Sequence, residues 1–338
     1  MLYVSTRNTS DSYTAYRALH ENCAPDGGLF APYHLPAFSI EDRNGLLNKT
    51  FGERVAKILN IFFPIRLNGW DVDFAIGRHP YKLVAMNHRL YIAELWNNLN
   101  GNFAFIEKRL YLKMCEGNYV VQCPSHWAKV AIRISLLASI CCELIKSNAA
   151  CMDFAGITGD YLFVVAAWYV RKMGFPIGKI ICTSDENGSA WDFFHKGVVP
   201  CVFENAHEQN SNASYLELLI YEMLGVPGVE GFLACSNKGI AYQLDEEQIA
   251  AVSQNMEGAV VSHKRAKVLI RSIFSTHNHL ADPYTAIAYG GLQDYRSRTG
   301  ESRTTIIFAE ASPFDYEKTI TEAVGISSTE FRKQMGNH

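Results

Sequence analysis

Two glycines separated by two residues precede a long apolar segment, and this spacing can bind an anion. The sequence Gly156-Ile157-Thr158-Gly159-Asp160 lies between an apolar run and a helical pattern, which predicts a strand, a tight turn and a helix. Glycine lets the backbone approach a ligand closely, and the first N–H groups of the following helix carry partial positive charge. The pattern also fits an ordinary strand-to-helix turn, because it is much shorter than a dinucleotide or P-loop fingerprint.

Length and composition limit what the ligand can be. The chain has 338 residues, of which 48% are apolar, enough for a large core and one or two domains. A net charge of −3 provides no basic field, so neither nucleic acid nor an anionic membrane is an expected partner. We therefore expect a small ligand. The first residues, Met1 to Arg7, do not resemble a signal peptide, and we expect a cytoplasmic protein.

The cysteines do not form a metal-binding pattern. Nine are present, with no CxxC pair and no cysteine-histidine spacing typical of zinc ligands. An odd number without a secretory signal indicates reduced thiols in the core. The sequence therefore predicts no metal site.

Alternation of strand and helix patterns after Leu83 predicts the fold class. We expect an α/β protein with a small N-terminal α/β domain at 1–80, and a domain at 81–338 built on a mostly parallel sheet with helices on both faces. The apolar runs at Val130–Ile145 and Tyr161–Val170 are expected to be core helices. The other expected elements are strands at 3–5, 82–96 (two) and 305–314, helices near 13–20, 40–63, 211–223, 246–257 and 264–276, and a turn-rich connection at 225–231.

Several strings resemble one known family. They are the opening Tyr3-x-Ser5-Thr6-Arg7, the string APDGGLFAP from Ala24, the string KMGFPI from Lys172, and DPYTA from Asp282. Together they resemble threonine synthases, which are fold-type II enzymes dependent on pyridoxal phosphate (PLP). The resemblance implies that the loop around Gly156 corresponds to the loop that holds the PLP phosphate. Contacts to an anion or a remnant PLP phosphate are then expected from Gly156, Thr158, Gly159 and Ser312.

The sequence departs from the family where the cofactor would be anchored. Ile106 stands where the resemblance places the Schiff-base lysine, and isoleucine has no amine with which to form an aldimine. We therefore expect no PLP cofactor. Lys108 lies two residues further along the chain and could supply the amine only if the alignment with the family were shifted. Two residues turn a helix by roughly 200°, which points this side chain away from the pocket. Glu310 replaces a threonine that faces the pyridine nitrogen in the family, and Ile157 with Thr158 replaces Asn-Phe in the phosphate loop.

A whole lobe is also expected to be missing. Trp127, in the next recognisable family segment, follows Lys108 by only 19 positions (127 − 108 = 19). A βαβ unit takes roughly thirty residues or more. A sheet that lacks one lobe should leave apolar surface uncovered, and we expect a homodimer or a partner protein to cover it.

Three functions are compatible with these residues. The first is a threonine-synthase-like protein that has lost PLP-dependent catalysis and serves as a binding, regulatory or partner subunit. The second is an enzyme with PLP-independent chemistry on a small phosphorylated or amino-acid-like ligand, and the third is a PLP-dependent lyase that uses Lys108. The candidate catalytic groups are Lys108, Glu107 and Glu310, with Asp160 and His126 as further acid/base groups.

Any surviving pocket is expected at the carboxyl end of the strand before Gly156. There the loop 155–160 should meet 310–312 and 105–108, because open parallel sheets bind ligands outside the carboxyl ends of their strands. Glu310 would need a cationic partner, for which Arg303 and Lys318 are candidates. In the alternative interpretation, Ile106 and Ile157 pack together as core and leave no cavity.

Overall fold

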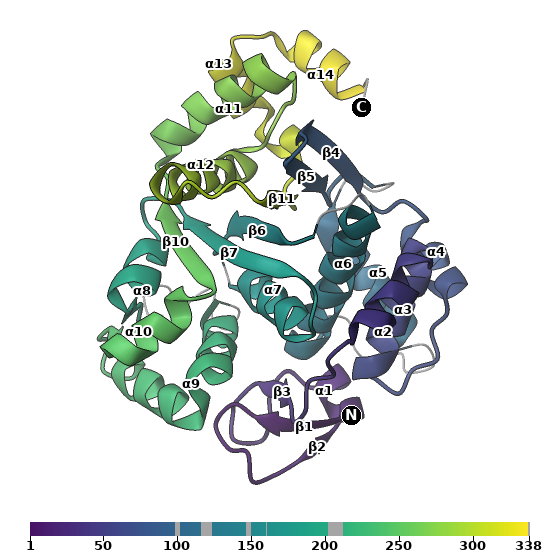
Figure 1. The fold of residues 1–338 in the computed structure, drawn as a ribbon, viewed down its shortest axis with the longest axis vertical. Coiled ribbons are helices and arrows are strands. Elements are labelled where there is room, and N and C mark those ends of the chain that lie inside the picture. Colours follow the sequence, from purple (N-terminus) through teal and green to yellow (C-terminus); the bar gives the residue numbers. More distant parts are fainter. Residues whose placement is uncertain (99–101, 116–123, 147–149, 160, 202–211, 337–338) are drawn as a thin grey trace.

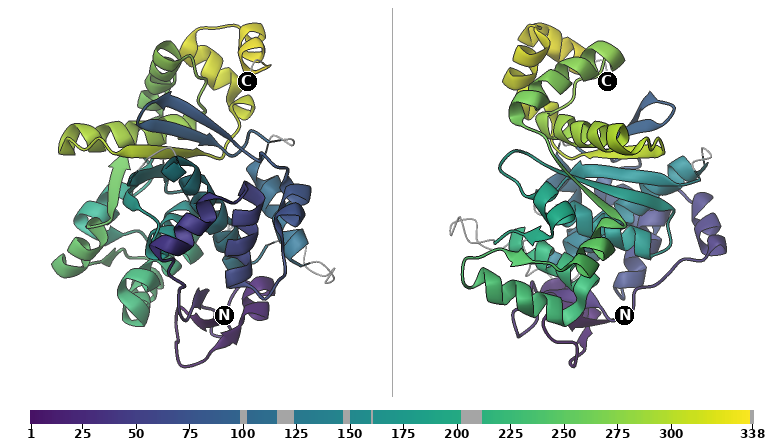
Figure 2. Two further views of the ribbon diagram at one scale, coloured as in Figure 1. Left: turned by 45° about the vertical axis from the view of Figure 1, so that its right-hand side comes forward. Right: turned by 60° about the vertical axis from the view of Figure 1, so that its left-hand side comes forward.

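The structure is a computed structural model that describes residues 1–98, 102–115, 124–146, 150–159, 161–201 and 212–336. Asp160, one of the candidate acid/base residues, lies outside the described residues. The two ends of the described chain lie at opposite ends of the molecule, with the N-terminal sheet at one end and the C-terminal helices at the other (Figures 1 and 2).

A small antiparallel sheet opens the chain, followed by three helices. The sheet has the order β2-β1-β3. Each of the three helices starts with a reciprocal capping box, in which the N-cap side chain and the third helical residue bond each other's backbone N–H. The elements are β1 (Leu2–Ser5), β2 (Tyr13–Thr14), α1 (Ala15–His20), β3 (Phe30–Pro32), α2 (Ile40–Leu47), α3 (Phe51–Phe62) and α4 (Gly69–Ile76).

A six-stranded sheet forms the centre of the molecule, with the order β10-β7-β6-β11-β5-β4. Its first five strands are parallel, and only β4 at the edge runs antiparallel to its neighbour β5. The mostly parallel sheet predicted from the sequence is therefore confirmed. The strands are β4 (Lys82–Asn87), β5 (Leu90–Glu94), β6 (Met152–Ile157), β7 (Ile177–Ser184), β10 (Met256–Val260) and β11 (Thr304–Ala309).

Successive residues of the central strands point into two different cores. In β11, Ile306 and Phe308 belong to one buried cluster, whereas Ile307 and Ala309 belong to the other. The same alternation puts Phe154 and Ala155 of β6 on opposite faces. A sheet that is apolar on both faces has to be covered by helices on both sides.

The helices cover the two faces as Figures 1 and 2 show. On one face α12 crosses β6, β7, β10 and β11, and α11 and α13 pack behind it. On the other face α7 packs on β6 and β7, with α6 behind it. The helices around the central sheet and at the C-terminus are α5 (Phe103–Met114), α6 (His126–Lys146), α7 (Leu162–Lys172), α11 (His263–His277), α12 (Pro283–Thr299), α13 (Glu317–Val324) and α14 (Ser328–Gly336). A 3-10 turn, η1 (Pro313–Tyr316), follows β11.

The region between β7 and β10 differs from the prediction at two places. The segment 225–231 is not a loop connection, because α9 continues through it with a kink at Gly225, whose φ is 70°. Pro227 then lies in the first turn after the kink, where its missing N–H is not needed. The helix predicted to reach 257 ends at Ser253, and Met256 already begins β10. The elements are α8 (Ala190–Lys196), β8 (Val198–Val199), α9 (Asn212–Ser236), β9 (Tyr242–Gln243) and α10 (Glu246–Ser253).

Helix α6 follows α5 with little chain between them. Only the segment 115–125 separates the end of α5 at Met114 from the start of α6 at His126. That segment is far shorter than the roughly thirty residues of a βαβ unit.

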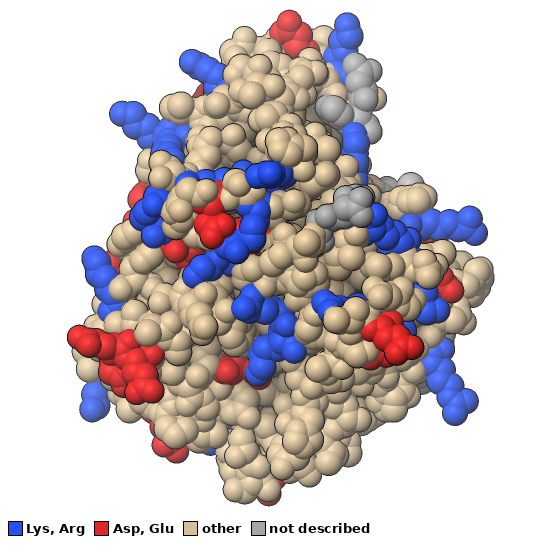
Figure 3. Space-filling model, viewed as in Figure 1, with Lys and Arg blue, Asp and Glu red and all other residues tan. Residues whose placement is uncertain are grey.

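One helical stretch satisfies the length and composition expected of a membrane span within the part of the chain that the structure describes. It is Tyr215–Ser236 of α9, which is 33% buried inside the molecule and contains the kink at Gly225. Both signs of charge are scattered over the face of the molecule in Figure 3, and uncharged residues cover most of it.

Candidate functional site

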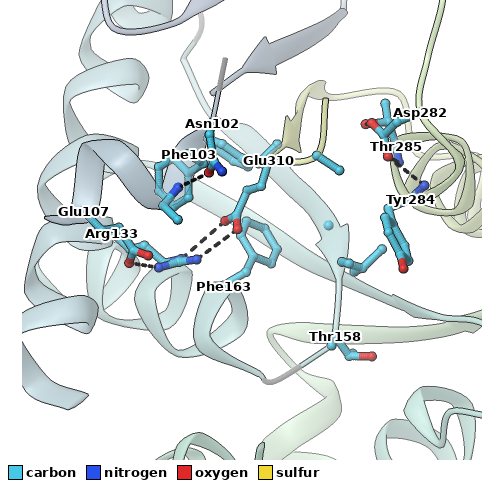
Figure 4. Close-up of a pocket in the computed structure, with 16 residues that line it drawn as sticks. Asn102, Phe103, Glu107, Arg133, Thr158, Phe163, Asp282, Tyr284, Thr285 and Glu310 are labelled. Atoms are coloured by element: carbon cyan, nitrogen blue, oxygen red, sulfur yellow. Dashed lines mark hydrogen bonds and ion pairs between the residues drawn. The ribbon is translucent and has the colours of Figure 1, made fainter. Parts of the chain in front are cut away.

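A cavity of about 360 Å³ lies at the carboxyl ends of β6 and β11. Glu310 and Ala311 follow β11, and Gly156 to Gly159 end β6 and follow it. The first turns of α5, α7 and α12 complete its wall (Figure 4). The cavity is thus where the sequence placed the pocket, because parallel strands bring their carboxyl ends to one edge of the sheet.

Arg133 of α6 holds two carboxylates at one end of this cavity. Its Nη2 donates to Glu310 Oε2 at 2.9 Å and its Nε to Glu310 Oε1 at 3.3 Å, while Nη1 donates to Glu107. The guanidinium also lies over the Phe103 ring, 4.7 Å from its centroid. The side chains of Arg133 and Glu107 are 11% and 12% exposed, and that of Glu310 is 37% exposed. One cation therefore joins α5, α6 and the end of β11 (Figure 4).

Helix α5 turns one particular face to the cavity. Phe103, Ala104 and Glu107 line it, as expected for neighbours one turn apart. Ile106 is 1% exposed and belongs to the core cluster instead. Lys108 is exposed and does not line the cavity. The structure therefore brings Glu107 and Glu310 together, but not Lys108.

Ile106 and Ile157 do not fill the corner as a common core. Ile106 belongs to the cluster on the α6 side, whereas Ile157 packs against the cluster on the α12 side. Ile157 lines the cavity and Ile106 does not. The interpretation in which these two residues close the pocket is wrong, because they lie on different faces of the sheet.

The first glycine of the loop makes room for a phenyl ring. A Cβ on Gly156 would lie 2.6 Å from Phe163 Cε1, so this ring occupies the space that the missing side chain leaves. A Cβ on Gly159 would meet only Ile157, at 3.9 Å, and Gly159 has a φ of +38°. Gly159 is thus the glycine that borders open space, whereas Gly156 serves the packing of α7 on β6.

Thr158 cannot offer its backbone donor to a ligand. Its N–H donates to Thr183 O at 2.8 Å, and its hydroxyl lies 3.4 Å from the same oxygen. The turn then closes through Tyr161 N–H to Thr158 O at 2.5 Å, with Tyr161 in the left-handed region. Tyr161 is the N-cap residue of α7, and its own side chain makes no capping hydrogen bond. The backbone donors at this end of the cavity are therefore fewer than the sequence predicts.

Ser312 lies beyond the cavity lining. It is 5% exposed and caps the 3-10 turn η1, because its hydroxyl accepts a hydrogen bond from Phe314 N at 3.3 Å. Its hydroxyl thus serves the local backbone rather than the cavity. The anion contact predicted for Ser312 is not brought to the site.

Asp282 is a buried carboxyl on the opposite wall. It is 1% exposed and caps α12, accepting from Tyr284 N at 2.8 Å and Thr285 N at 3.1 Å as well as from the Thr285 hydroxyl. Burial raises the pKa of Asp282 to about 6, although these hydrogen bonds oppose the increase. Asp282 thus titrates nearer to neutral pH than an exposed aspartate.

Because the pKa of Asp282 is raised on folding, the protonated carboxyl is the form that the fold favours. Its contribution to stability is present below about pH 4 and is lost as the pH rises through about 6. The variant Asp282→Asn is neutral throughout. We compare the unfolding free energy of the variant with that of the unmodified protein. The value for the variant minus that for the unmodified protein should increase by about 2–3 kcal/mol as the pH rises from 4 to 7.

Urea unfolding at several pH values measures this difference. Asp245→Asn, at the exposed N-cap of α10, shows what the same substitution does at a cap on the surface. A difference between Asp282→Asn and the unmodified protein that stays constant from pH 4 to pH 7 would contradict the assignment.

Two other predictions also differ from the structure. Glu310 pairs with Arg133, while Arg303 pairs with Asp153 at 3.2 Å, so the cationic partner comes from α6. His126 begins α6 and does not line the cavity; its ring lies 5.5 Å from that of Tyr215. Of the acid/base groups that the sequence singled out, the described structure brings Glu107 and Glu310 to the cavity.

Sequence reasoning missed the residue that organises this site. Arg133 lies within the run 130–145, which the sequence predicts only as a core helix, although a charge inside an apolar helix needs a partner. That rule was the available signal, and it would have directed attention to Glu107 and Glu310. The phenylalanines at positions 103, 163 and 308, which form the apolar wall, carried no such signal, because buried aromatic residues are common in any core.

Comparisons with known proteins agree with the fold. The sequence model of one protein family, the threonine synthase N terminus, matches residues 2–73 of this chain. A threonine synthase of Corynebacterium glutamicum is 26% identical over 213 residues, which cover 59% of this chain and 44% of that protein. Threonine synthase-like 1 of Homo sapiens is 24% identical over 176 residues, covering 48% of this chain and 24% of that protein. The matches thus span less than half the length of these relatives.

Solved structures of threonine synthases have the same fold. The PLP-bound enzyme from Brucella melitensis superposes with a TM-score of 0.78 at 17% identity, covering 96% of this chain and 92% of that chain. The yeast enzyme superposes with a TM-score of 0.80 at 16% identity, covering 97% and 90%. The described fold is therefore that of fold-type II PLP proteins. The N-terminal match and these superpositions agree with the resemblance to threonine synthases.

Proposed function

We propose that this chain is a threonine-synthase-like protein that does not form a Schiff base with PLP and serves as a binding, regulatory or partner subunit. One observation carries the proposal. Of the residues that line the cavity, all of them within the described part of the chain, none is a lysine. This does not depend on how α5 is aligned with the family, because both possible positions lie away from the cavity: Ile106 in the core and Lys108 on the surface.

The rest of the cavity also does not fit PLP held as the resemblance implies. The Thr158 N–H is already bonded to Thr183, and Phe163 fills the space beside Gly156. Glu310 and Glu107, which both pair with Arg133, would face the anionic cofactor. We therefore propose that PLP is not a cofactor of this chain, and no reaction step is assigned to it.

Spectroscopy of the purified protein tests this proposal. After incubation with PLP we expect no aldimine absorption band, and after borohydride reduction no protein adduct by mass spectrometry. With homoserine phosphate and PLP we expect no threonine and no inorganic phosphate, while an active threonine synthase treated in parallel gives both. An aldimine band that disappears in Lys108→Ala would instead establish the lyase that uses Lys108.

A second candidate function rests on the two carboxylates. Glu107 and Glu310 lie together beside an apolar cavity, which is a position from which a carboxylate can exchange protons with a bound ligand. The chain would then be a PLP-independent enzyme acting on a small phosphorylated or amino-acid-like ligand. Product formation that persists without PLP and is abolished by Glu310→Gln would favour this function.

We also propose that the protein is a homodimer. The rings of Trp70 and Phe74 on α4 are stacked at 5.3 Å and are 66% and 64% exposed, and Leu112 of the adjoining helix α5 is 46% exposed. Such exposed apolar side chains are typical of interaction surfaces.

Light scattering at micromolar concentration should report a dimer, and Trp70→Glu with Phe74→Glu should shift it to a monomer. Ile40→Glu, at a residue that is 70% exposed on α2, is the control for an added surface charge. A monomeric unmodified protein would contradict the proposal.

A further inference from the structure

We propose that the cavity binds a small organic ligand with a primary amine on an apolar or aromatic body, in preference to a phosphate-bearing ligand. The inference rests on the proposed function, since it takes the cavity to be free of Schiff-base-bound PLP. It is based on the charge and shape of the cavity, which the lining residues determine. Those residues form an acidic end, an aromatic wall and a loop that has few remaining donors.

The acidic end favours a cation. The described side chains there are two carboxylates, Glu107 and Glu310, and one guanidinium, Arg133, which bonds to both. An anion entering beside Glu310 meets a carboxylate that lines the cavity and is 37% exposed (Figure 4). A ligand ammonium meets an acceptor at the same place, and the charged hydrogen bond that results is stronger than one between neutral groups.

Glu310 keeps acceptor capacity for such an ammonium. Arg133 donates one hydrogen bond to each of its oxygens, at 3.3 and 2.9 Å. A carboxylate has about four lone-pair sites. The Arg133 contact thus fixes the direction of the carboxylate without using all of its acceptors. An ammonium with three donors can bond to Glu310 without displacing Arg133.

The walls next to this end are aromatic. Phe103, Phe163 and Phe308 line the cavity, and the rings of Phe163 and Phe308 lie 5.4 Å apart. Arg133 already covers one face of Phe103. Rings of this kind pack well against a flat apolar body in offset or edge-to-face geometry. The volume of about 360 Å³ lies near the lower end of the range for small-molecule sites, which limits the ligand to one ring and its substituents.

The groups that would bind an anion are largely engaged within the protein. The Asn102 side chain caps α5 by accepting from Ala104 N at 2.8 Å. Asp282 caps α12 in the same way, and its own carboxylate stands at that helix end. Thr158 N–H is bonded to Thr183 O. Helix α7 also begins beside the cavity, and a helix N-terminus favours an anion, so phosphate is the competing ligand in the test.

Four probes that share a phenyl body but differ in charge provide the test. They are 2-phenylethylamine, 2-phenylethanol, 3-phenylpropionate and phenyl phosphate, titrated by calorimetry and by ligand-observed NMR into the full chain. We expect the amine to bind most tightly, the alcohol next and the two anions most weakly. Glu310→Gln should weaken the amine by about tenfold or more, because it removes a charged hydrogen bond, and should leave the alcohol unchanged.

Two further variants keep the outcome interpretable. Glu107→Gln removes the other carboxylate and is expected to weaken the amine in the same direction, so that the test survives if Glu310→Gln fails to fold. Glu247→Gln, on the exposed side of α10, makes the same change of net charge away from the cavity and should leave all four affinities unchanged.

The possible results separate this inference from the proposed function. Tighter binding of phenyl phosphate or 3-phenylpropionate than of the amine would overturn the inference. So would an amine affinity that neither glutamine variant changes, or no amine binding at millimolar concentration. An aldimine band with PLP would instead overturn the proposed function, whatever the order of the four probes.

Discussion

Replacing Arg133 by methionine is expected to lower the free energy of unfolding by about 2–4 kcal/mol. The guanidinium is 11% exposed and bonds to both Glu107 and Glu310. Its removal takes away the cation that pairs with both carboxylates, and the two negative charges then repel each other in a partly buried site. Loss of one partner of a buried pair costs about 3–5 kcal/mol, and we reduce this value because Glu310 is 37% exposed and water screens it. Chemical unfolding monitored by circular dichroism measures the change.

Variants of the two glutamates show whether charge is the cause. Arg133→Met combined with Glu107→Gln and Glu310→Gln removes both carboxylates together with the cation that pairs with them, and stability should return to within about 1 kcal/mol of the unmodified protein. Arg133→Lys keeps the charge but lacks the planar fork that reaches both oxygens of Glu310, so an intermediate loss is expected. If the triple variant is as unstable as Arg133→Met, lost packing on Phe103 rather than charge would be responsible.

Arg133 also shows how far a sequence can lead to a site. Its helix is almost entirely buried, and an arginine in such a helix requires an acidic partner because an isolated buried charge is too costly. The two glutamates could therefore be suspected of meeting it. Which carboxylates do so depends on how α5 and the end of β11 are placed against α6, and no local pattern determines that arrangement.

The position of the cavity was predictable for a more general reason. Alternating strands and helices predict a parallel sheet, and a parallel sheet exposes all its carboxyl ends at one edge. The glycines at 156 and 159 mark where β6 reaches that edge. Their separate roles were not predictable, since only the packed structure shows Phe163 beside one and open space beside the other.

Local signals failed where packing outweighed them. Glycine and proline at 225–231 predict a loop, yet α9 continues through the segment because the break is confined to Gly225, and the helix packs against α7. Thr158 looked like a phosphate contact because of its place in the loop. Its N–H is used by the neighbouring strand β7, a long-range pairing that the loop sequence does not reveal.

The orientation of α5 leads to the second large effect. Ile106 is 1% exposed in the core, while Ala104, two residues earlier on the same helix, is exposed and lines the cavity. A lysine introduced at 106 would place an amine in apolar surroundings and remove a well-packed side chain. We expect Ile106→Lys to destabilise the protein by about 3–5 kcal/mol at pH 7 and to give no aldimine band with PLP. Unfolding in urea and absorption spectra measure the two effects.

The pH dependence and two controls distinguish a buried amine from a mere packing defect. Burial lowers the pKa of a lysine below its ordinary value of about 10.4, so the penalty is largest at low pH. It should diminish by up to about 1.4 kcal/mol per pH unit as the pH rises toward 10. Ile106→Met changes the packing without charge and should show no such slope. Ala104→Lys adds the amine on the exposed side of α5 and should change stability by less than about 0.5 kcal/mol. If Ile106→Lys were as stable as Ala104→Lys, or gave an aldimine band, position 106 would face the cavity and the lysine site would have been lost by a single substitution.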